Sequence, residues 1–142
     1  MAAWQPVFES SRDIVGDDLF DLIYTDPDAR KREQVANACR DDVPTQVWVA
    51  EFEDEITGFI TFKMNNDRLV GEIGNNAVSP DFQGRGIGTQ MYEFVLGKMK
   101  DAGMNGAIVE TGSDDARARA RQAYEKVGFS GAIPSLRYHI EL

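Results

Sequence analysis

Histidine and cysteine are nearly absent from this sequence of 142 residues, which contains one of each. A lone cysteine, Cys39, cannot form an internal disulfide, and a metal site built on a histidine pair or on a C-x-x-C motif is excluded as well. We therefore expect no bound metal. The N-terminal region also lacks an apolar run long enough for a signal peptide or a membrane span, so the sequence predicts a cytoplasmic protein with no membrane partner.

Basic residues are scarce too. The chain has 15 Lys and Arg residues against 24 Asp and Glu residues, which gives a formal net charge of −9 at pH 7. This charge repels the phosphate backbone of nucleic acids, so we expect no nucleic-acid partner and favour a cationic substrate over an acidic one. The hydrophobic content of 42% is sufficient for one core at this length, and we expect residues 1–142 to form a single domain.

Apolar periodicity divides the first half of the chain into two helices followed by three strands. The helices are expected at 12–24 and 27–40, and the strands at 46–52, 56–64 and 69–79. Gly71 and Gly74 interrupt the third strand, and they predict a bulge or a close approach of the backbone to a neighbour.

The second half of the chain alternates helices and strands. We expect a helix over 87–102, a strand over 107–111, a helix from Ser113 or Asp114 to the residue before Gly128, and a last strand over 136–141. Antiparallel strands followed by this alternation predict an α+β (mixed α/β) fold, with a mostly antiparallel mixed sheet and helices on both faces. An exposed strand edge near the C-terminus would permit a homodimer.

The run V-S-P-D-F-Q-G-R-G-I-G-T, residues 78–89, is the most informative part of the sequence. It ends a strand, turns through three glycines and opens a helix, so backbone N–H groups converge where a phosphate group can bind. Neither the G-x-G-x-x-G motif of dinucleotide-binding folds nor the G-K-[ST] ending of nucleoside-triphosphate loops is present. From the spacing alone, an ordinary strand-to-helix turn is an equal alternative.

Two motifs resemble those of the GNAT acetyltransferases, the general-control-related N-acetyltransferases. Gln83-x-x-Gly86-x-Gly88 after V-S-P resembles their coenzyme A signature, and A-R-A-R-Q-A-Y-E-K-V-G-F, residues 118–129, is similar to the ending common in the family. The first 45 residues, where family members differ most, match only weakly. The resemblance implies a GNAT-like fold and an N-acetyltransferase that moves an acetyl group from acetyl-CoA to a primary amine, by direct attack in a ternary complex.

The resemblance also implies where acetyl-CoA binds. In the family, the pantetheine arm pairs with backbone groups of the strand end, residues 77–80 here, and the pyrophosphate binds at the glycine turn. Arg117 stands where family members often carry asparagine, so a solvated ion pair is the alternative role for it. The implied coenzyme contacts are Ala77, Val78, Ser79, Pro80, Gln83, Gly84, Arg85, Gly86, Ile87, Gly88, Thr89 and Arg117.

Tyr124 is the general acid that the resemblance implies, because family members place a tyrosine before E-K-x-G-F with its hydroxyl near the thioester sulfur. A phenol with a reference pKa of about 10 can give a proton to a departing thiolate at neutral pH. The alternative is that Tyr124 only fills the buried face of its helix.

Glu72 is the implied general base. An alkylammonium group with a reference pKa of about 10.4 must lose a proton before it can attack a thioester. Some relatives that acetylate protein lysines carry a glutamate in the strand before the coenzyme loop, as Glu72 lies six residues before Val78. Its neighbours Val70 and Ile73 would raise the pKa of the carboxyl by desolvation. The alternatives are a water relay in place of Glu72, and a solvated carboxylate without a catalytic role.

The acceptor is expected to be a small-molecule amine, a protein lysine or a protein N-terminal amine. A different class of function is a catalytically silent module on the same fold, which senses acyl-CoA or binds a protein partner. Thiol release that depends on an amine would indicate the enzyme, whereas coenzyme binding without thiol release would indicate the sensor.

Overall fold

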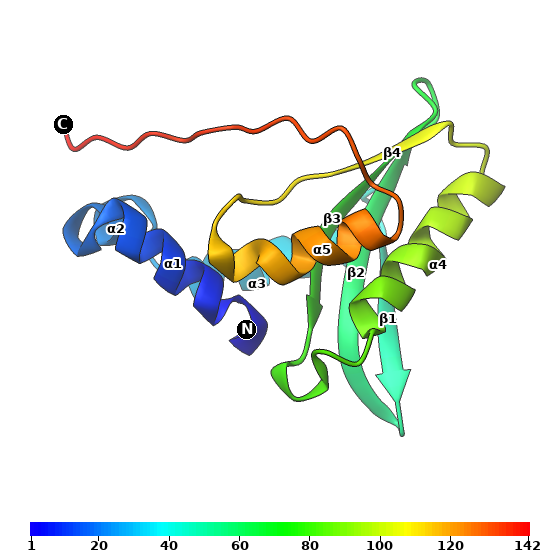
Figure 1. The fold of residues 1–142 in the computed structure, drawn as a ribbon, viewed down its shortest axis with the longest axis horizontal. Helices are drawn as coiled ribbons and strands as arrows, with labels where there is room; N and C mark the ends of the chain where they lie inside the picture. Colours follow the sequence, from blue (N-terminus) through cyan, green and yellow to red (C-terminus); the bar gives the residue numbers. More distant parts are fainter.

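A four-stranded sheet with the order β1-β2-β3-β4 forms the centre of the computed structural model, which describes residues 1–142 (Figure 1). The strands are β1 Gln46–Phe52, β2 Glu55–Asn65, β3 Val70–Val78 and β4 Gly106–Val109. The β1–β2 and β2–β3 pairs are antiparallel, and β3 and β4 are parallel. The structure therefore confirms the α+β class with a mostly antiparallel mixed sheet.

Helices lie on both faces of this sheet. They are α1 Gln5–Val15, α2 Asp17–Ile23, α3 Pro27–Ala38, α4 Ile87–Asp101 and α5 Ala118–Lys126. In Figure 1, α5 lies in front of the sheet and α3 lies behind it. The short N-terminal turn that precedes α1 also contacts the sheet, since the rings of Trp4 and Phe59 pack edge to face with centroids 5.7 Å apart. None of the helices combines the length and the apolar composition needed to cross a bilayer.

The hydrophobic core lies between the sheet and the α4–α5 layer. Apolar residues recur along α4 at helical spacing and pack on the apolar side chains of β2 and β3. The buried members are Ile60, Phe62, Ile73, Met91, Tyr92, Val95, Met99 and Tyr124. Gly71 is required for this packing, because a Cβ atom there would overlap the side chain of Met99.

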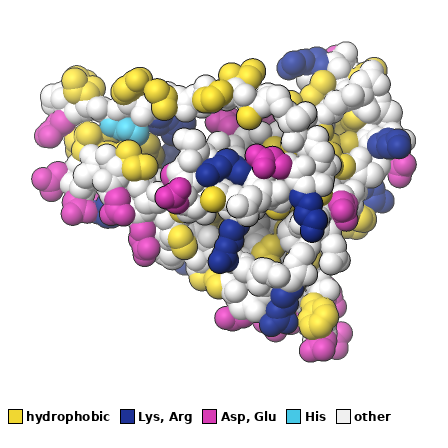
Figure 2. All heavy atoms as spheres, viewed as in Figure 1, with side chains coloured by type: hydrophobic (Ala, Val, Ile, Leu, Met, Phe, Trp, Pro, Cys, Tyr) yellow, Lys and Arg dark blue, Asp and Glu magenta, His cyan; other side chains and the backbone are white.

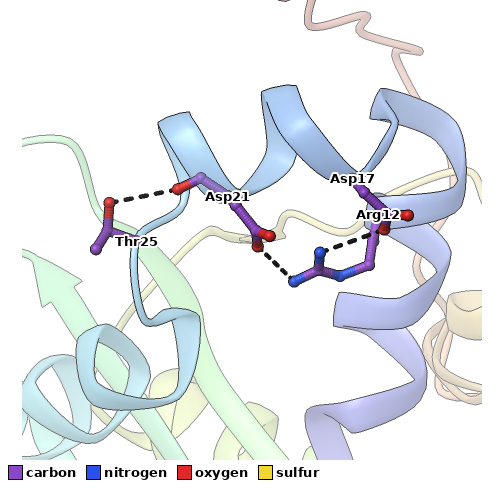
Figure 3. Close-up of polar contacts among 4 residues, drawn as sticks. All are labelled: Arg12, Asp17, Asp21 and Thr25. Atoms are coloured by element: carbon purple, nitrogen blue, oxygen red, sulfur yellow. Dashed lines mark hydrogen bonds and ion pairs between the residues drawn. The ribbon is translucent and has the colours of Figure 1, made fainter.

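The structure corrects the prediction of one helix over 12–24. The chain bends at Gly16, whose φ of +89° favours glycine, and two helices meet there instead of one. Arg12 fastens this corner, with its guanidinium 3.3 Å from the Asp17 carboxylate and 2.7 Å from that of Asp21 (Figure 3). The buried side chain of this region is that of Phe20.

The predicted last strand over 136–141 is wrong. Residues 130–142 form no strand, and they run in an extended path past α1 and α2 (Figure 1). The alternating side chains Leu136, Tyr138 and Ile140 are all exposed, and the segment contacts α2 through Tyr24 Oη, which lies 2.6 Å from His139 Nε2. Alternation of apolar residues indicates extended backbone, but it does not supply a partner strand.

Candidate active site

An open backbone edge on β3 is the first element of the site. Pairing between β3 and β4 ends at Ile73 and Val109, although β3 continues to Val78. A register shift opposite Ile60 and Phe62 marks the expected bulge, and a Cβ atom at Gly74 would lie 2.6 Å from Thr61 Oγ1. The backbone of 74–78 therefore has no neighbouring strand on the side where β4 ends.

The glycine turn is the second element. Gly84 and Gly86 have φ values of +77° and +82°, which L-residues with a side chain rarely adopt. The first hydrogen bond of α4 runs from the Gln90 N–H to the Gly86 carbonyl, so the N–H groups of 87–89 have no backbone acceptor. This is the arrangement that binds anions at a helix N-terminus. Gly88 differs from the other two glycines, because it lies in the first turn of α4 without a positive φ.

Side-chain contacts fix the chain between strand and turn. The Gln83 amide donates to the Val78 carbonyl at 3.1 Å, and Arg119 donates to the Gln83 side-chain oxygen at 3.4 Å. The Arg85 guanidinium lies over the Phe82 ring, 5.0 Å from its centroid. A backbone hydrogen bond from the Ser79 N–H to the Thr57 carbonyl also holds the end of β3 against β2.

A cavity of about 1070 Å³ joins the two elements. It is bounded by the β3 edge and the glycine turn on one side, and by α5 and the first three helices on the others. Of the predicted site residues, the cavity is lined by Ala77, Val78, Gln83, Gly84, Gly86, Ile87, Gly88, Thr89, Arg117 and Tyr124. Ser79, Pro80, Arg85 and Glu72 do not line it.

The Tyr124 hydroxyl ends a directed chain of hydrogen bonds. The Asn76 amide nitrogen donates to the Gly74 carbonyl at 3.0 Å and to Tyr124 Oη at 3.2 Å, and Tyr92 donates to Asn76 Oδ1 at 2.8 Å. A carbonyl can only accept, so the Gly74 contact fixes the orientation of the Asn76 amide. Tyr124 therefore accepts from Asn76, and its own proton is directed to another acceptor.

Burial of this tyrosine pair is nearly complete. Tyr124 is 6% exposed, and its ring centroid lies 4.7 Å from that of Tyr92. Burial, and next the proximity of Tyr124, raise the pKa of Tyr92 far above its ordinary value. Tyr92 therefore stays protonated and acts as a donor to Asn76. The geometry is compatible with Tyr124 as a general acid and with Tyr124 as a core residue, because its ring fills the core while the residue also lines the cavity.

Glu72 is not brought together with Tyr124. Its carboxylate lies 3.0 Å from Lys63 Nζ, and its side chain is 43% exposed. It lines a second cavity of about 400 Å³, which shares the lining residues Gly74 and Asn75 with the larger one. The apolar environment expected around this carboxylate is absent, because a cation and solvent surround it instead.

Arg117 forms an ion pair with Asp114 at the start of the α5 segment. Arg121 supports the same loop by donating to the carbonyl groups of Gly112 and Asp114, at 2.8 and 2.6 Å. The second carboxylate oxygen of Asp114 is buried and has no hydrogen-bond partner. Arg117 thus forms an ion pair, but the pair is mostly buried and not solvated as the predicted alternative had it, and the residue lines the cavity as well.

Several cavity residues come from the poorly matched first 45 residues, and sequence patterns did not indicate them. Lys31 is half-buried and donates to Gln34 Oε1 and Asn75 Oδ1, each at 2.9 Å. Burial lowers its pKa, as do the nearby charges of Arg117 and Arg30. The only sequence feature near this position is the pair Asn75 and Asn76, beside the bulge at Gly74. The α3 helix is charged along most of its length, so nothing in its own pattern distinguishes Lys31.

Two carboxylates also line the cavity without having been predicted. Glu110 follows β4 directly, and Asp115 begins the short turn before α5. The end of a strand that leaves its sheet is the signal that could have indicated Glu110. No group of three or more His, Cys, Asp or Glu side chains is placed to hold a metal ion.

Residues 12–129 match the model of the Acetyltransferase (GNAT) family. Mycothiol acetyltransferase of Streptomyces coelicolor is 29% identical over 98 residues, which are 69% of this chain and 31% of that relative. The chain therefore spans about a third of the length of this relative.

Solved structures share the fold. An aminoglycoside N-acetyltransferase, AAC(6')-Iy, in complex with CoA has a TM-score of 0.62 and 16% identity, covering 80% of this chain and 88% of that one. A GNAT family acetyltransferase from Elizabethkingia anophelis with acetyl-CoA bound has a TM-score of 0.59 and 27% identity, covering 74% and 63%. The family match over most of the sequence confirms the resemblance of the two motifs, and this chain belongs to the acetyltransferase (GNAT) family.

Proposed function

We propose that the chain is an acetyl-CoA-dependent N-acetyltransferase and that residues 1–142 form one catalytic domain. The observation that carries this proposal is a single cavity lined by the open β3 edge, the glycine turn and Tyr124. Two structural relatives hold CoA or acetyl-CoA, which supports the choice of the acetyl donor.

The coenzyme binds along the strand end and the turn in this proposal. The backbone groups of Ala77 and Val78, the two residues of 77–80 that line the cavity, pair with the amide groups of the pantetheine arm, as an added strand would. The N–H groups that open α4, together with those of Gly84 and Gly86, hold the diphosphate. Arg119 lies beside the same turn through its contact with Gln83 and adds positive charge there.

Tyr124 supplies the proton that the leaving group needs. The acceptor amine forms a C–N bond with the acetyl carbon, and the C–S bond then breaks with its electron pair on sulfur. Because Asn76 already donates to Tyr124 Oη, the tyrosine proton is free to move to that sulfur as the thiolate leaves. A backbone N–H of the open β3 edge polarises the thioester carbonyl while the tetrahedral intermediate forms.

Glu72 takes the proton of the attacking ammonium through water. Both cavities are lined by Gly74 and Asn75, and a water chain past these residues would connect the acceptor nitrogen with the Glu72 carboxylate. Lys63 Nζ lies 3.0 Å from this carboxylate and fixes its position. Glu110 is the competing candidate, because it lines the larger cavity directly.

A small-molecule amine is the favoured acceptor. One structural relative is by name an aminoglycoside N-acetyltransferase, which acts on a small molecule. The first three helices contribute apolar and aromatic side chains to the cavity, and a lining of this kind is typical of small-molecule sites. The silent acyl-CoA sensor is the second candidate, and the distance of Glu72 from Tyr124 is the observation in its favour.

Titration calorimetry with acetyl-CoA tests the proposal. We expect the wild-type chain to bind, and Gly86→Ala to bind at least about tenfold more weakly, because a Cβ atom strains the left-handed turn. Gly97→Ala adds the same methyl group to α4 at a position without close neighbours, and it should bind like the wild type. Absence of binding by the wild type would overturn the proposal, and binding without amine-dependent thiol release would favour the sensor.

A further inference from the structure

We propose that Lys31 is an anion anchor in the acceptor half of the cavity. The acceptor amine then also carries a carboxylate and an apolar or aromatic group, as an apolar amino acid does. This inference rests on the proposed acetyltransferase function and names the class of acceptor.

The surroundings of Lys31 leave its charge uncompensated. Its two hydrogen-bond partners, the side chains of Gln34 and Asn75, are neutral, and its ammonium lies 5.3 Å from the centroid of the Trp4 ring. The charged groups that act on it are Arg30 on the same helix and Arg117 across the cavity, both cationic. A half-buried cation that faces another cation is stabilised by an anion placed between them.

The charges that line the cavity have the opposite sign to the whole chain. Four cationic side chains line it, namely Lys31, Arg117, Arg119 and Arg137, against the two carboxylates of Glu110 and Asp115. Figure 2 shows basic side chains across the middle of this face, over α5, while acidic ones gather around α1 and α2. The net charge of −9 favoured a cationic acceptor, whereas the lining of the cavity favours an anionic group.

Contacts within the protein distinguish three of the four cations of the cavity. Arg119 contacts Gln83 of the glycine turn and so belongs to the coenzyme end. Arg117 is already paired with Asp114. Lys31 has only the neutral partners Gln34 and Asn75, so its charge is available to an acceptor.

Aromatic side chains of the N-terminal segment and α2 form the wall beside Lys31. Trp4, Phe8, Phe20 and Tyr24 all line the cavity. The Trp4 ring is held by its edge-to-face contact with Phe59, and the Tyr24 ring packs on Phe20 with centroids 5.0 Å apart. Such a wall is predominantly apolar and suits an apolar or aromatic side chain, since the Tyr24 hydroxyl is already bonded to His139.

The anchor and the reacting atoms line one cavity. Asn75 binds Lys31, and the next residue, Asn76, binds the Tyr124 hydroxyl. Consecutive side chains of a strand point to opposite faces, so Lys31 and Tyr124 approach the open edge of β3 from its two sides. An acceptor in this cavity can therefore place its amine at the open β3 edge and its carboxylate at Lys31.

Binding of 3-phenylpropionate tests the anchor without any acetyl transfer, since this probe has the carboxylate and the ring but no amine. We expect calorimetry to detect its binding to the wild-type chain, at least about tenfold more tightly than binding of the uncharged 3-phenylpropanamide. Lys31→Gln should lose this preference and Lys31→Arg should keep it. Lys100→Gln, which changes an exposed lysine of α4, is the matched control and should behave like the wild type.

The outcomes separate this inference from the proposed function. Equal binding of the two probes by the wild type, or binding of neither, would overturn the anchor. The anchor is also overturned if Lys31→Gln loses acetyl-CoA affinity but keeps the carboxylate preference, since Lys31 would then serve the coenzyme. Acetyl-CoA binding by the same wild-type sample decides the proposed function, and thermal melts of each variant confirm that it is folded.

Discussion

The hydrogen bonds around Asn76 fix the position of the Tyr124 hydroxyl. Two donors of the Asn76 amide are used by Gly74 and Tyr124, and Tyr92 satisfies its oxygen. A buried hydroxyl needs such a partner in either role, so the network fits both the catalytic and the packing alternative. A variant that removes only the hydroxyl distinguishes them.

Tyr124→Phe should lower kcat by about 100-fold or more, because general acid catalysis commonly contributes that much. The affinity for acetyl-CoA should change little, since the ring and its packing on Tyr92 and Phe129 are retained. Steady-state kinetics and calorimetry on the same sample measure both quantities. Tyr138→Phe, which changes an exposed tyrosine of the C-terminal segment, is the matched control. An unchanged kcat would remove Tyr124 from the mechanism.

The base is tested by comparing two carboxylates. Glu72→Gln should abolish the acidic limb of the pH profile of kcat/KM, because that limb reports protonation of the essential base in the free enzyme. Glu110→Gln should leave the limb in place. If the reverse is observed, the carboxylate that lines the larger cavity is the base, and Glu72 serves only its ion pair with Lys63.

At the residue scale, the sequence predicts the residues that belong to motifs. It does not predict the residues whose role depends on packing between separate elements. The glycine turn is predictable because residues with positive φ leave a signature in the sequence. The position of Lys31 is not predictable, because it depends on the contact of α3 with β3 at Asn75. No local sequence pattern indicates that contact. Glu72 shows the converse: its position in the strand was clear, while its exposure and its partner Lys63 belong to the folded chain.

At the element scale, the α1–α2 corner is a small unit with its own pH dependence. Its ion pairs join the end of α1 to α2, and Arg12 also lies over the Phe20 ring at 4.6 Å. The hydrogen bond from Arg12 lowers the pKa of Asp21 below its ordinary value of 3.8. A carboxyl with a lowered folded pKa stabilises the fold above the unfolded pKa, and this contribution is lost as the pH falls through the folded value.

Asp21→Asn should therefore melt slightly below the wild type at pH 7, and the difference should shrink below pH 3.8 and vanish once the pH is below the lowered folded pKa of Asp21. Circular dichroism melts over a pH series measure it. The effect is small because the pair is exposed to solvent. Asp13→Asn removes an exposed carboxylate of α1 without an ion pair and should show no such pH-dependent difference. A difference that persisted in acid would contradict the assignment to the Arg12 contact.

Element boundaries could be predicted well where turns punctuate alternating strands. The three strands of the antiparallel part end within about a residue of their expected limits, because Asn-rich and acidic turns interrupt them. The prediction of the first helix was wrong because the apolar periodicity continues across Gly16, where the chain bends. The last strand failed because its partner strand, not its own pattern, decides whether it forms.

At the scale of the whole molecule, the sheet order places the two motifs on one cavity. The glycine turn follows β3 and the Tyr124 motif follows β4, and these strands are neighbours that separate at their ends. The sequence predicts this half of the cavity, because the glycine turn and the Tyr124 motif are recognisable locally and each follows its strand. The other half is built by α1–α3, whose placement depends on tertiary contacts such as that of Trp4 with Phe59.

A core of eight buried side chains beside a cavity of about 1070 Å³ makes the folded state itself sensitive to occupancy. A ligand that binds only the folded form adds about 2.7 kcal/mol of stability when its free concentration is 100 times its Kd. That gain is a substantial fraction of the roughly 5–15 kcal/mol by which a small domain is usually stable. The supply of coenzyme would then set the lifetime of the folded chain against degradation, in addition to the rate at which it works.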